Sequence, residues 1–323
     1  MNGARNGKTM KEKMAEGQKL AQSIYQAALE AGFDNCGVIS LDDMQSFDAR
    51  LKERIEAVPE SGPFYESIRG NADIRKRFPW AKSLVICITR YGKYHYPEQL
   101  QGRYAKSFFL SEESKPAERH KQQHTLTQWF DEQNIRWVHG PYGLRHAAVQ
   151  AGLGIIRKNN FFYDEKGSWL NLAGYVIDKE CQLYQEHPCR PCPSNCHLCV
   201  KNCPTGSLSA PYVINPSRCI SYCTTFGKGI IPKGVDEKAF GEWLIGCDRC
   251  QDICPFNRHD WTSGEDFPGI EELLPLLEPE TLLAATDEEL INRVIPKTAD
   301  HIHPEEVETL RRNAARLLRN RKN

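Results

Sequence analysis

Apolar positions along the first ninety residues predict a helix followed by two buried strands. Between residues 10 and 33 the apolar side chains recur with the 3.6-residue period of an amphipathic helix, and Gly32 supplies a stop signal. Two continuous apolar runs, 35–39 and 83–89, have the length and composition of buried strands. Helices and strands that alternate in this way indicate an α/β domain.

The pattern changes at about residue 180, where Cys and Pro become frequent, and again at about residue 263. Further elements are expected as helices at 120–134, 142–151, 280–294 and 305–320 and as a strand at 172–177. We therefore expect a mixed α+β or α/β domain at 1–180, a cysteine-rich domain at 181–262 and a short helical C-terminal tail at 263–323.

The charge balance changes this picture little. Lys plus Arg and Asp plus Glu both number 42, so the chain lacks the cationic excess typical of nucleic-acid or membrane-surface proteins. Residues 311–322 form a basic stretch, which is more often the solvated face of a last helix than a phosphate-binding patch. The sequence shows neither a secretory signal nor an apolar run of about 18 residues, so we expect a soluble, cytoplasmic protein.

The cysteines carry the strongest chemical signal. Of the 13 cysteines, all but Cys36 and Cys87 lie between residues 181 and 254. In a reducing compartment such a cluster indicates metal binding and not a disulfide framework. Cys36 and Cys87 fall inside the predicted strands and are expected to be core residues.

Two cysteine motifs end in the same phrase. The first is Cys192-x3-Cys196-x2-Cys199-x3-Cys203-Pro204, and the second is Cys219 followed by Cys247-x2-Cys250-x3-Cys254-Pro255. This ending is that of the bacterial ferredoxin run, in which the last cysteine of each motif binds the other motif's [4Fe–4S] cluster. The spacing predicts one cluster on Cys192, Cys196, Cys199 and Cys254 and another on Cys203, Cys219, Cys247 and Cys250. The first ligand is open between Cys192, which we favour, and Cys189.

Other metal sites explain the motifs less well. Zinc also takes paired Cys-x2-Cys elements, but it does not account for the third cysteine and the proline of each motif. The run Cys192-x3-Cys196-x2-Cys199 matches the radical S-adenosylmethionine signature, but the chain that follows it is too short for the barrel that such a signature normally opens.

Phrases on both sides of these motifs resemble the epoxyqueuosine reductase family, which is related to reductive dehalogenases. In chain order they are Ala151-Gly152-Leu153-Gly154, Lys158-Asn159, Gly167-Ser168-Trp169, Cys203-Pro204-Thr205-Gly206, Arg218-Cys219-Ile220-Ser221-Tyr222 and Gly246-Cys247-Asp248-x-Cys250-Gln251-x2-Cys254-Pro255-x-Asn257. The resemblance is strong from 140 to 257 and weak before 110.

The resemblance implies a nitroreductase-like α/β domain that binds a cobalamin, next to a ferredoxin module whose two clusters reduce it. Reduced ferredoxin or flavodoxin is the implied electron donor, and cob(I)alamin is the implied reductant. The residues implied to line the corrinoid cavity are Gly152, Gly154, Lys158, Asn159, Gly167, Ser168 and Trp169. The sequence lacks an Asp-x-His-x2-Gly phrase for a lower histidine ligand, which is consistent with base-off binding.

The active-site acids of the family are not matched. Val138 stands where the family has an aspartate that donates a proton, and Phe109 and Ser111 stand where it has an Asp and a His. His139 is a candidate substitute donor, since a histidine pKa near 6.5 suits that role. The helical tail also looks shorter than the one that the family uses near tRNA, so tRNA binding is doubtful and the substrate is expected to differ. The alternative is an electron carrier or corrinoid-handling protein that turns over no substrate.

Overall fold

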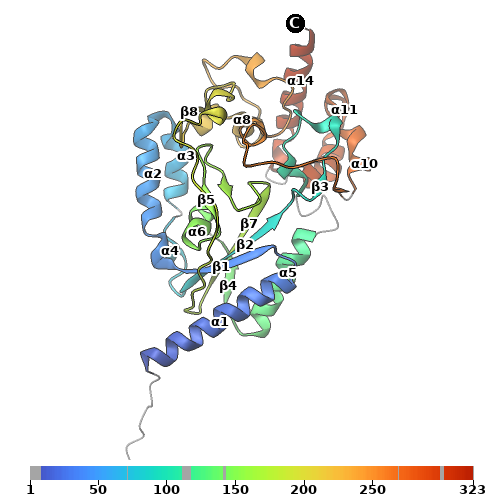
Figure 1. Ribbon diagram of the computed structural model, residues 1–323. Coiled ribbons are helices and arrows are strands. Elements are labelled where there is room, and N and C mark those ends of the chain that lie inside the picture. Colours follow the sequence, from blue (N-terminus) through green and yellow to red (C-terminus); the bar gives the residue numbers. More distant parts are fainter. Residues whose placement is uncertain are drawn as a thin grey trace, which may run out of the picture.

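A four-stranded sheet lies at the centre of the computed structural model, which describes residues 9–70, 72–110, 118–140, 143–267, 269–298 and 302–322 (Figure 1). The strand order is β1 (Asn35–Ser40), β2 (Ser83–Arg90), β7 (Leu170–Ile177) and β4 (Trp137–His139). Each neighbouring pair is antiparallel. The predicted strands are confirmed, but they do not form the parallel sheet that helix–strand alternation usually indicates, because the helices between β1 and β2 return the chain in the opposite direction.

Two helical layers cover the sheet. Helices α1 (Met10–Glu30) and α5 (Glu118–Glu132) lie on one face, and α6 (Leu144–Gln150) packs on the other. Further helices between β1 and β2, which periodicity did not predict, are α2 (Ser46–Ala57), α3 (Gly62–Arg69) and α4 (Ile74–Arg77). Alternate residues of each strand face opposite layers, so Val85 joins the α1 side and Ile86 the α6 side. Cys36 and Cys87 are fully buried on the α1 side, as predicted.

The helix ends follow the sequence closely. Thr9 and Glu12 form a capping box at the start of α1, and Gly32 follows the last turn with φ of 98°. Helix α6 ends in the same way, because Gly152 has φ of 71° just after the last turn. A side chain is strained in this left-handed region, which explains why glycine stands at both stops.

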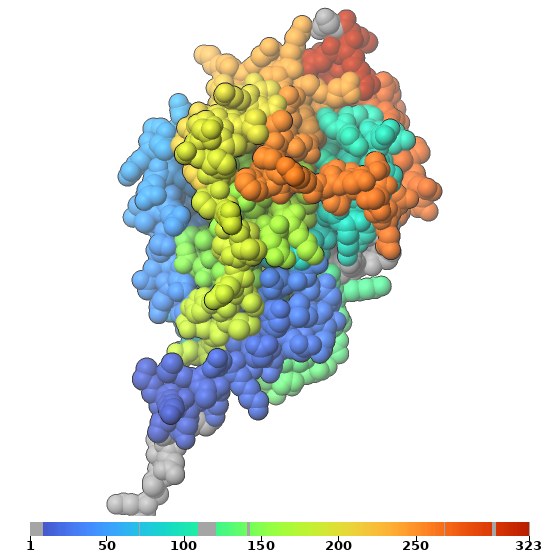
Figure 2. Space-filling model, in the orientation of Figure 1, coloured from blue at the N-terminus to red at the C-terminus, as the bar shows by residue number. Residues whose placement is uncertain are grey.

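The cysteine-rich segment starts as an extended chain along the α/β unit. It runs from the end of β7 past β1 and α6 towards the opposite end of the sheet (Figures 1 and 2). Leu183 exchanges backbone hydrogen bonds with Val38, and the Gln185 amide donates to the Ala151 carbonyl. Short elements follow: α7 (Leu198–Lys201), β8 (Leu208–Ala210), β9 (Val213–Ile214), α8 (Ile220–Thr224) and α9 (Arg249–Asp252).

The C-terminal helices pack on a second core. They are α10 (Ile270–Leu273), α11 (Pro279–Ala284), α12 (Asp287–Glu289), α13 (Ile295–Thr298) and α14 (Glu308–Lys322). Leu282 and Leu310 share this core with Tyr96 and Tyr104, which follow β2. The remaining short strands are β3 (Tyr94–His95), β5 (Ile155–Ile156), β6 (Phe162–Tyr163) and β10 (Glu265–Asp266). The predicted single helix at 280–294 is wrong, because α11 ends at Ala284 and Thr286 caps a new helix through a capping box with Glu289.

The basic stretch at 311–322 is occupied by contacts within the chain. Arg319 pairs with Glu237 at 3.0 Å, and Arg321 pairs with Glu242 at 3.1 Å. Arg316 is buried over the Phe240 ring, and burial lowers its pKa to about 10. These contacts favour the structural interpretation of the stretch over a phosphate-binding one. Within the described residues, no helix has the length and apolar content needed to cross a membrane.

Candidate functional site

Four cysteines from both motifs line one cavity, and we call them the outer set. They are Cys192, Cys196, Cys199 and Cys254, and they share the cavity with Lys158 and Phe256. Burial, followed by the neighbouring Cys254 and Cys192 thiols, raises the pKa of Cys199. Leu198 and Phe256 beside the cavity are 45% and 37% exposed, so this set lies close to the protein surface.

The other four predicted ligands form an inner set, Cys203, Cys219, Cys247 and Cys250. Burial raises the pKa of Cys250 first, and the charges of Cys247, Cys219 and Cys203 raise it further. The same neighbours act on Cys247, so the four thiols lie close together. Helices α7 and α9 pack side by side, and the Asn202 side chain donates to the Arg249 carbonyl at 3.1 Å.

The grouping of the thiols follows the crossed arrangement that the spacing predicted. Cys254 of the second motif joins three cysteines of the first, and Cys203 of the first joins those of the second. Cys189 lies apart from the outer cavity, with its thiol 3.9 Å from the Tyr163 carbonyl oxygen. This geometry favours Cys192 over Cys189 as the first ligand of the outer set.

The thiols are spread more widely than a single ion requires. Among the described residues, no group of three or more His, Cys, Asp or Glu side chains converges closely enough to hold one metal ion. In a four-iron cluster each thiolate binds a different iron, so its ligands stand farther apart than those of one zinc ion. The donor sets therefore fit [4Fe–4S] clusters.

Lys158 and Asn159 connect the α/β unit to both sets. The buried Lys158 ammonium donates to the carbonyls of Pro193, Ser194 and Cys196 at 2.6, 2.9 and 2.9 Å. The Asn159 side-chain amide donates to the Cys250 carbonyl at 3.0 Å. These polar groups hold the cysteine loops, and the role of Lys158 and Asn159 in lining a corrinoid cavity stays a prediction.

The glycine-rich phrases also pack against the protein itself. A Cβ atom at Gly152 would collide with the Gln185 carbonyl, and one at Gly154 with the Tyr163 carbonyl. Gly167 lies against Asn257, whose Oδ1 would be 2.6 Å from an added Cβ. The close approach seen at Gly152 and Gly154 is to protein backbone, and that at Gly167 is to the Asn257 side chain. The expectation that these glycines also line a corrinoid cavity stays a prediction.

Ser168 and Trp169 form part of the same junction. The Ser168 hydroxyl accepts hydrogen bonds from Gln251 at 2.8 Å and from Asn257 at 2.7 Å. The Trp169 indole donates to the Asn257 carbonyl at 3.4 Å. Both residues therefore bind residues in or next to the second cysteine motif.

A polar junction around Arg145 was missed from the sequence. Arg145 keeps some exposed surface, but protein groups from four segments surround it. Removal of water from its guanidinium and the charge of Arg54 lower the pKa of Arg145, while Cys250, Tyr91 and Tyr65 raise it. It donates to the Asn160 carbonyl at 2.9 Å, and Arg54 donates to the Asn160 side-chain oxygen at 3.1 Å.

The same junction contains an unsatisfied polar atom. The Asn160 amide nitrogen is buried and has no hydrogen-bond partner within the described chain, and Asn160 has φ of 64°. An orphaned donor beside two guanidinium groups fits a polar ligand held between the α/β unit and the inner set. An arginine in an amphipathic segment looks like a surface residue, so no local signal distinguished Arg145.

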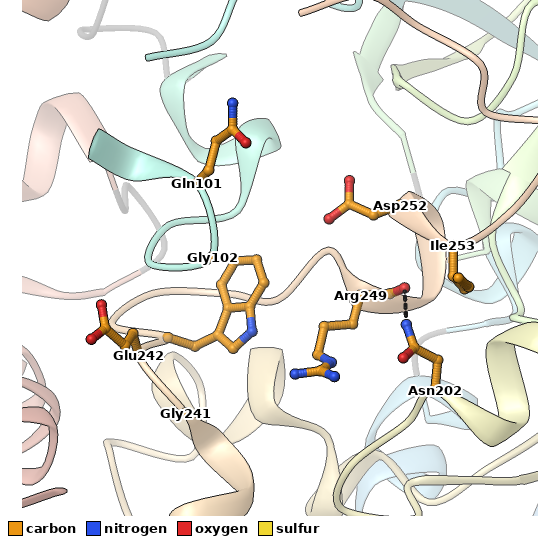
Figure 3. A pocket seen from close by; sticks show the side chains of 9 residues that line it. Gln101, Gly102, Asn202, Gly241, Glu242, Arg249, Asp252 and Ile253 are labelled. Atoms are coloured by element: carbon orange, nitrogen blue, oxygen red, sulfur yellow. Dashed lines mark hydrogen bonds between the residues drawn. The ribbon is translucent and has the colours of Figure 1, made fainter. Parts of the chain in front are cut away.

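Lys106 supports the inner set from the opposite side. Its buried ammonium lies 2.8 Å from Asp252 and 4.8 Å from the centre of the Trp169 ring. Its backbone amide donates to Asp248 at 2.8 Å, and burial raises the pKa of Asp248 to about 6. A hollow of about 520 Å³ opens beyond α9 (Figure 3). Arg249 and Asp252 line it, and none of its lining residues is a cysteine.

His139 lies away from these groups. Its exposed ring contacts the Tyr175 ring, with centroids 5.6 Å apart, on the α1 side of the sheet. Tyr175 is six residues along β7 from Trp169, or roughly 20 Å. Val138 instead packs on the α6 side. The proposal that His139 is a proton donor stays a prediction that this geometry does not favour. The Phe109 side chain and Ser111 lie outside the described residues.

Comparisons with known proteins agree with the cysteine chemistry. Residues 192–257 match the family model of a 4Fe-4S double cluster binding domain, which confirms the prediction of two [4Fe–4S] clusters. The epoxyqueuosine reductase of Cellulophaga algicola is 30% identical over 259 residues, which cover 75% of this chain and 80% of that protein.

Solved structures extend the likeness to most of the chain. An epoxyqueuosine reductase with an epoxyqueuosine-modified tRNA-Tyr stem loop superposes with a TM-score of 0.71 and 25% identity, over 93% of this chain and 81% of that one. A Bacillus subtilis epoxyqueuosine reductase, whose catalytic aspartate loop is swung out of the active site, gives the same TM-score, identity and coverage. The doubt about tRNA that the sequence raised therefore has no support from the relatives, one of which binds a tRNA stem loop.

Proposed function

The chain belongs to the epoxyqueuosine reductase family, and we propose that it is a corrinoid-dependent iron–sulfur reductase. The observation that carries the proposal is the position of the inner set. Cys250 lies within electrostatic range of Arg145, at the junction where the Asn160 amide lacks a partner. A cluster on the inner set would therefore stand next to a ligand bound at this junction.

The polar residues of the junction suit a corrinoid. When bound, a corrinoid supplies a redox-active cobalt centre. Its rim carries amide and phosphate oxygens, which the guanidinium groups of Arg54 and Arg145 would bind, while the free Asn160 amide nitrogen would donate to one more. The ligand sets proposed are the outer and inner cysteines named above, with Cys192 as the first ligand.

The two sets provide an ordered route for electrons. The outer set lies beside the exposed side chains of Leu198 and Phe256, where a soluble donor such as ferredoxin or flavodoxin would dock. In the inner set, Cys250 lies within electrostatic range of Arg145. Lys158 and Asn159 are adjacent in sequence and bind one loop of each set, so they fix the separation between the clusters.

We infer further that the substrate differs from epoxyqueuosine in tRNA. Opening an epoxide requires a proton, and a general acid typically contributes 10²–10⁴-fold to such a step. Val138 cannot donate a proton, and its side chain packs among the apolar residues on the α6 side. This supports a substrate whose reduction needs no acid at this position.

Turnover of epoxyqueuosine-modified tRNA tests the substrate proposal. The protein reconstituted with both clusters and cobalamin is expected to reduce this tRNA far more slowly than about 1 per second, an ordinary enzymatic rate. A gain of turnover in Val138→Asp would show that the missing acid limits the reaction, but this change alone is not required to restore it. Ordinary turnover by the wild type would contradict a changed substrate, and a large loss in His139→Ala would then identify His139 as the donor.

The same preparation separates a reductase from a carrier. If reduced clusters transfer electrons to bound cobalamin and no halogenated, epoxide or modified-base substrate is consumed, the electron-carrier alternative is favoured. The observation that favours the electron-carrier alternative is the packing of Val138 among apolar residues.

A further inference from the structure

We propose that Arg157 raises the reduction potential of the cluster on the outer cysteine set. Arg157 lies in the turn between β5 and β6, and its side chain lines the outer cavity together with the four thiols. The residue is only 4% exposed, and its Nη1 lies 3.8 Å from the Cys192 sulfur in donor geometry. The inference rests on the outer ligand set proposed above and needs neither the corrinoid nor the substrate.

The guanidinium is held in place by aromatic rings. Its central carbon lies 3.5 Å from the centre of the Phe256 ring and 5.1 Å from that of Tyr163. Phe256 follows Cys254 and Pro255 directly, so the ring contact holds the Arg157 guanidinium near Cys254 of the second motif as well as Cys192 of the first. An arginine stacked in this way cannot turn its charge into solvent without losing both ring contacts.

No carboxylate neutralises this charge within the described chain. Asp164, on the same hairpin, is paired with Arg90 at 2.6 Å. The Arg157 Nε is buried without a hydrogen-bond partner in the described residues. A buried charge without a counter-charge is costly, so the compensating negative charge is expected from the cluster and its thiolates.

The physical consequence is easier reduction of that cluster. One electron from a low-potential one-electron carrier, or from dithionite in the laboratory, adds one negative charge to the cluster, with no bond made or broken and no proton moved. A fixed positive charge and an N–H···S hydrogen bond both favour the more negative state. At a fixed solution potential, we expect Arg157 to increase the ratio of reduced to oxidised outer cluster at least tenfold, which corresponds to about 59 mV.

The test is a potentiometric titration of Arg157→Met, followed by EPR, in protein reconstituted anaerobically without corrinoid. Methionine keeps the apolar length of the side chain and removes the charge. The reduction potential of one cluster is expected to fall by at least about 59 mV, the tenfold ratio given above, while the other cluster keeps its potential. Arg157→Lys, which retains the charge, should recover most of the difference.

Two further variants identify the cluster and control for charge. Cys192→Ala should remove the signal of the cluster that shifts in Arg157→Met. Arg136 is also stacked on an aromatic ring, 4.3 Å from the centre of Trp80. Its backbone amide donates to Asp178, just past the end of β7 and at the opposite end of that strand from Trp169, so Arg136→Met should shift neither cluster.

Three results would overturn the inference. The first is that Arg157→Met binds about eight irons and both clusters keep their reduction potentials. The second is that the reduction potentials of both clusters shift equally. The third is that the variant loses about four irons, which would make Arg157 a structural support. If Cys192→Ala instead leaves both clusters intact, the outer ligand set is wrong, and the failure lies in that assignment.

Discussion

Replacing Lys158 by Met tests whether the α/β unit holds the outer cysteine loop. Three carbonyl groups, those of Pro193, Ser194 and Cys196, would lose a charged donor. A partly buried hydrogen bond from a charged donor contributes about 1 kcal/mol or more, so losing the three together weakens the closed loop by about 3 kcal/mol. That corresponds to a more than hundredfold change in the ratio of open to closed loop.

Iron and acid-labile sulfide per chain, measured after anaerobic purification, give the result directly. Lys158→Met should bind about four irons in place of about eight, with the remaining EPR signal that of the inner cluster. Lys166→Met removes an exposed lysine from the same hairpin region and should keep the full iron content. Asn159→Ala should show the reciprocal pattern, because Asn159 binds the Cys250 carbonyl.

The reasoning is refuted if Lys158→Met retains about eight irons with unchanged spectra. Loss of both clusters in equal measure would also contradict it, because the Lys158 ammonium donates to carbonyls in the segment from Pro193 to Cys196.

Three further outcomes follow from the structure. Cys254→Ala should abolish the same EPR signal as Cys196→Ala, and Cys203→Ala should abolish the same signal as Cys247→Ala. If instead Cys254→Ala abolishes the same signal as Cys247→Ala, the crossed arrangement is wrong. The hydrogen bond from Arg103 lowers the pKa of Glu278 below 4.5. Its stabilisation is therefore present above pH 4.5 and is lost as the pH falls through the lowered pKa, so Glu278→Gln should show a smaller loss of urea resistance between pH 6 and pH 3 than the wild type. Gly152→Ala combines φ of 71° with a clash against the Gln185 carbonyl and should cost roughly 2 kcal/mol or more in urea unfolding. Gly234→Ala, with φ of 79° and open space around an added Cβ, should cost less.

Local signals predicted the main helices and strands well. The continuous apolar runs at β1 and β2 and the glycine stops of α1 and α6 are properties of neighbouring residues, so they are readable without the fold. The cysteine spacing is a local signal of the same kind and predicted two [4Fe–4S] clusters, while the crossed ligand sets stay a prediction. Strand β4 has three residues and left no periodic signal, and the antiparallel order depends on how distant strands pair.

Roles that depend on distant partners were not readable from the sequence. Lys158 and Asn159 bind carbonyls 35 to 91 positions away, and nothing in their own neighbourhood distinguishes such contacts from ligand binding. Gly152 and Gly154 lie against protein backbone, a contact that their own neighbourhood in the sequence does not reveal, and their approach to a corrinoid stays a prediction. His139 was assigned by its adjacency to Val138, and neighbouring residues of a strand face opposite sides of the sheet.

Anaerobic titration of the reconstituted protein with cobalamin tests the central claim most directly. We predict one corrinoid bound per chain, with an EPR spectrum of bound cob(II)alamin that lacks nitrogen splitting from a protein histidine. Binding should weaken in Arg145→Met and in Asn160→Ala, while the iron content stays at about eight per chain. Absence of a complex at any cobalamin concentration, in protein that carries both clusters, would contradict the assignment of this chain as a corrinoid-dependent reductase.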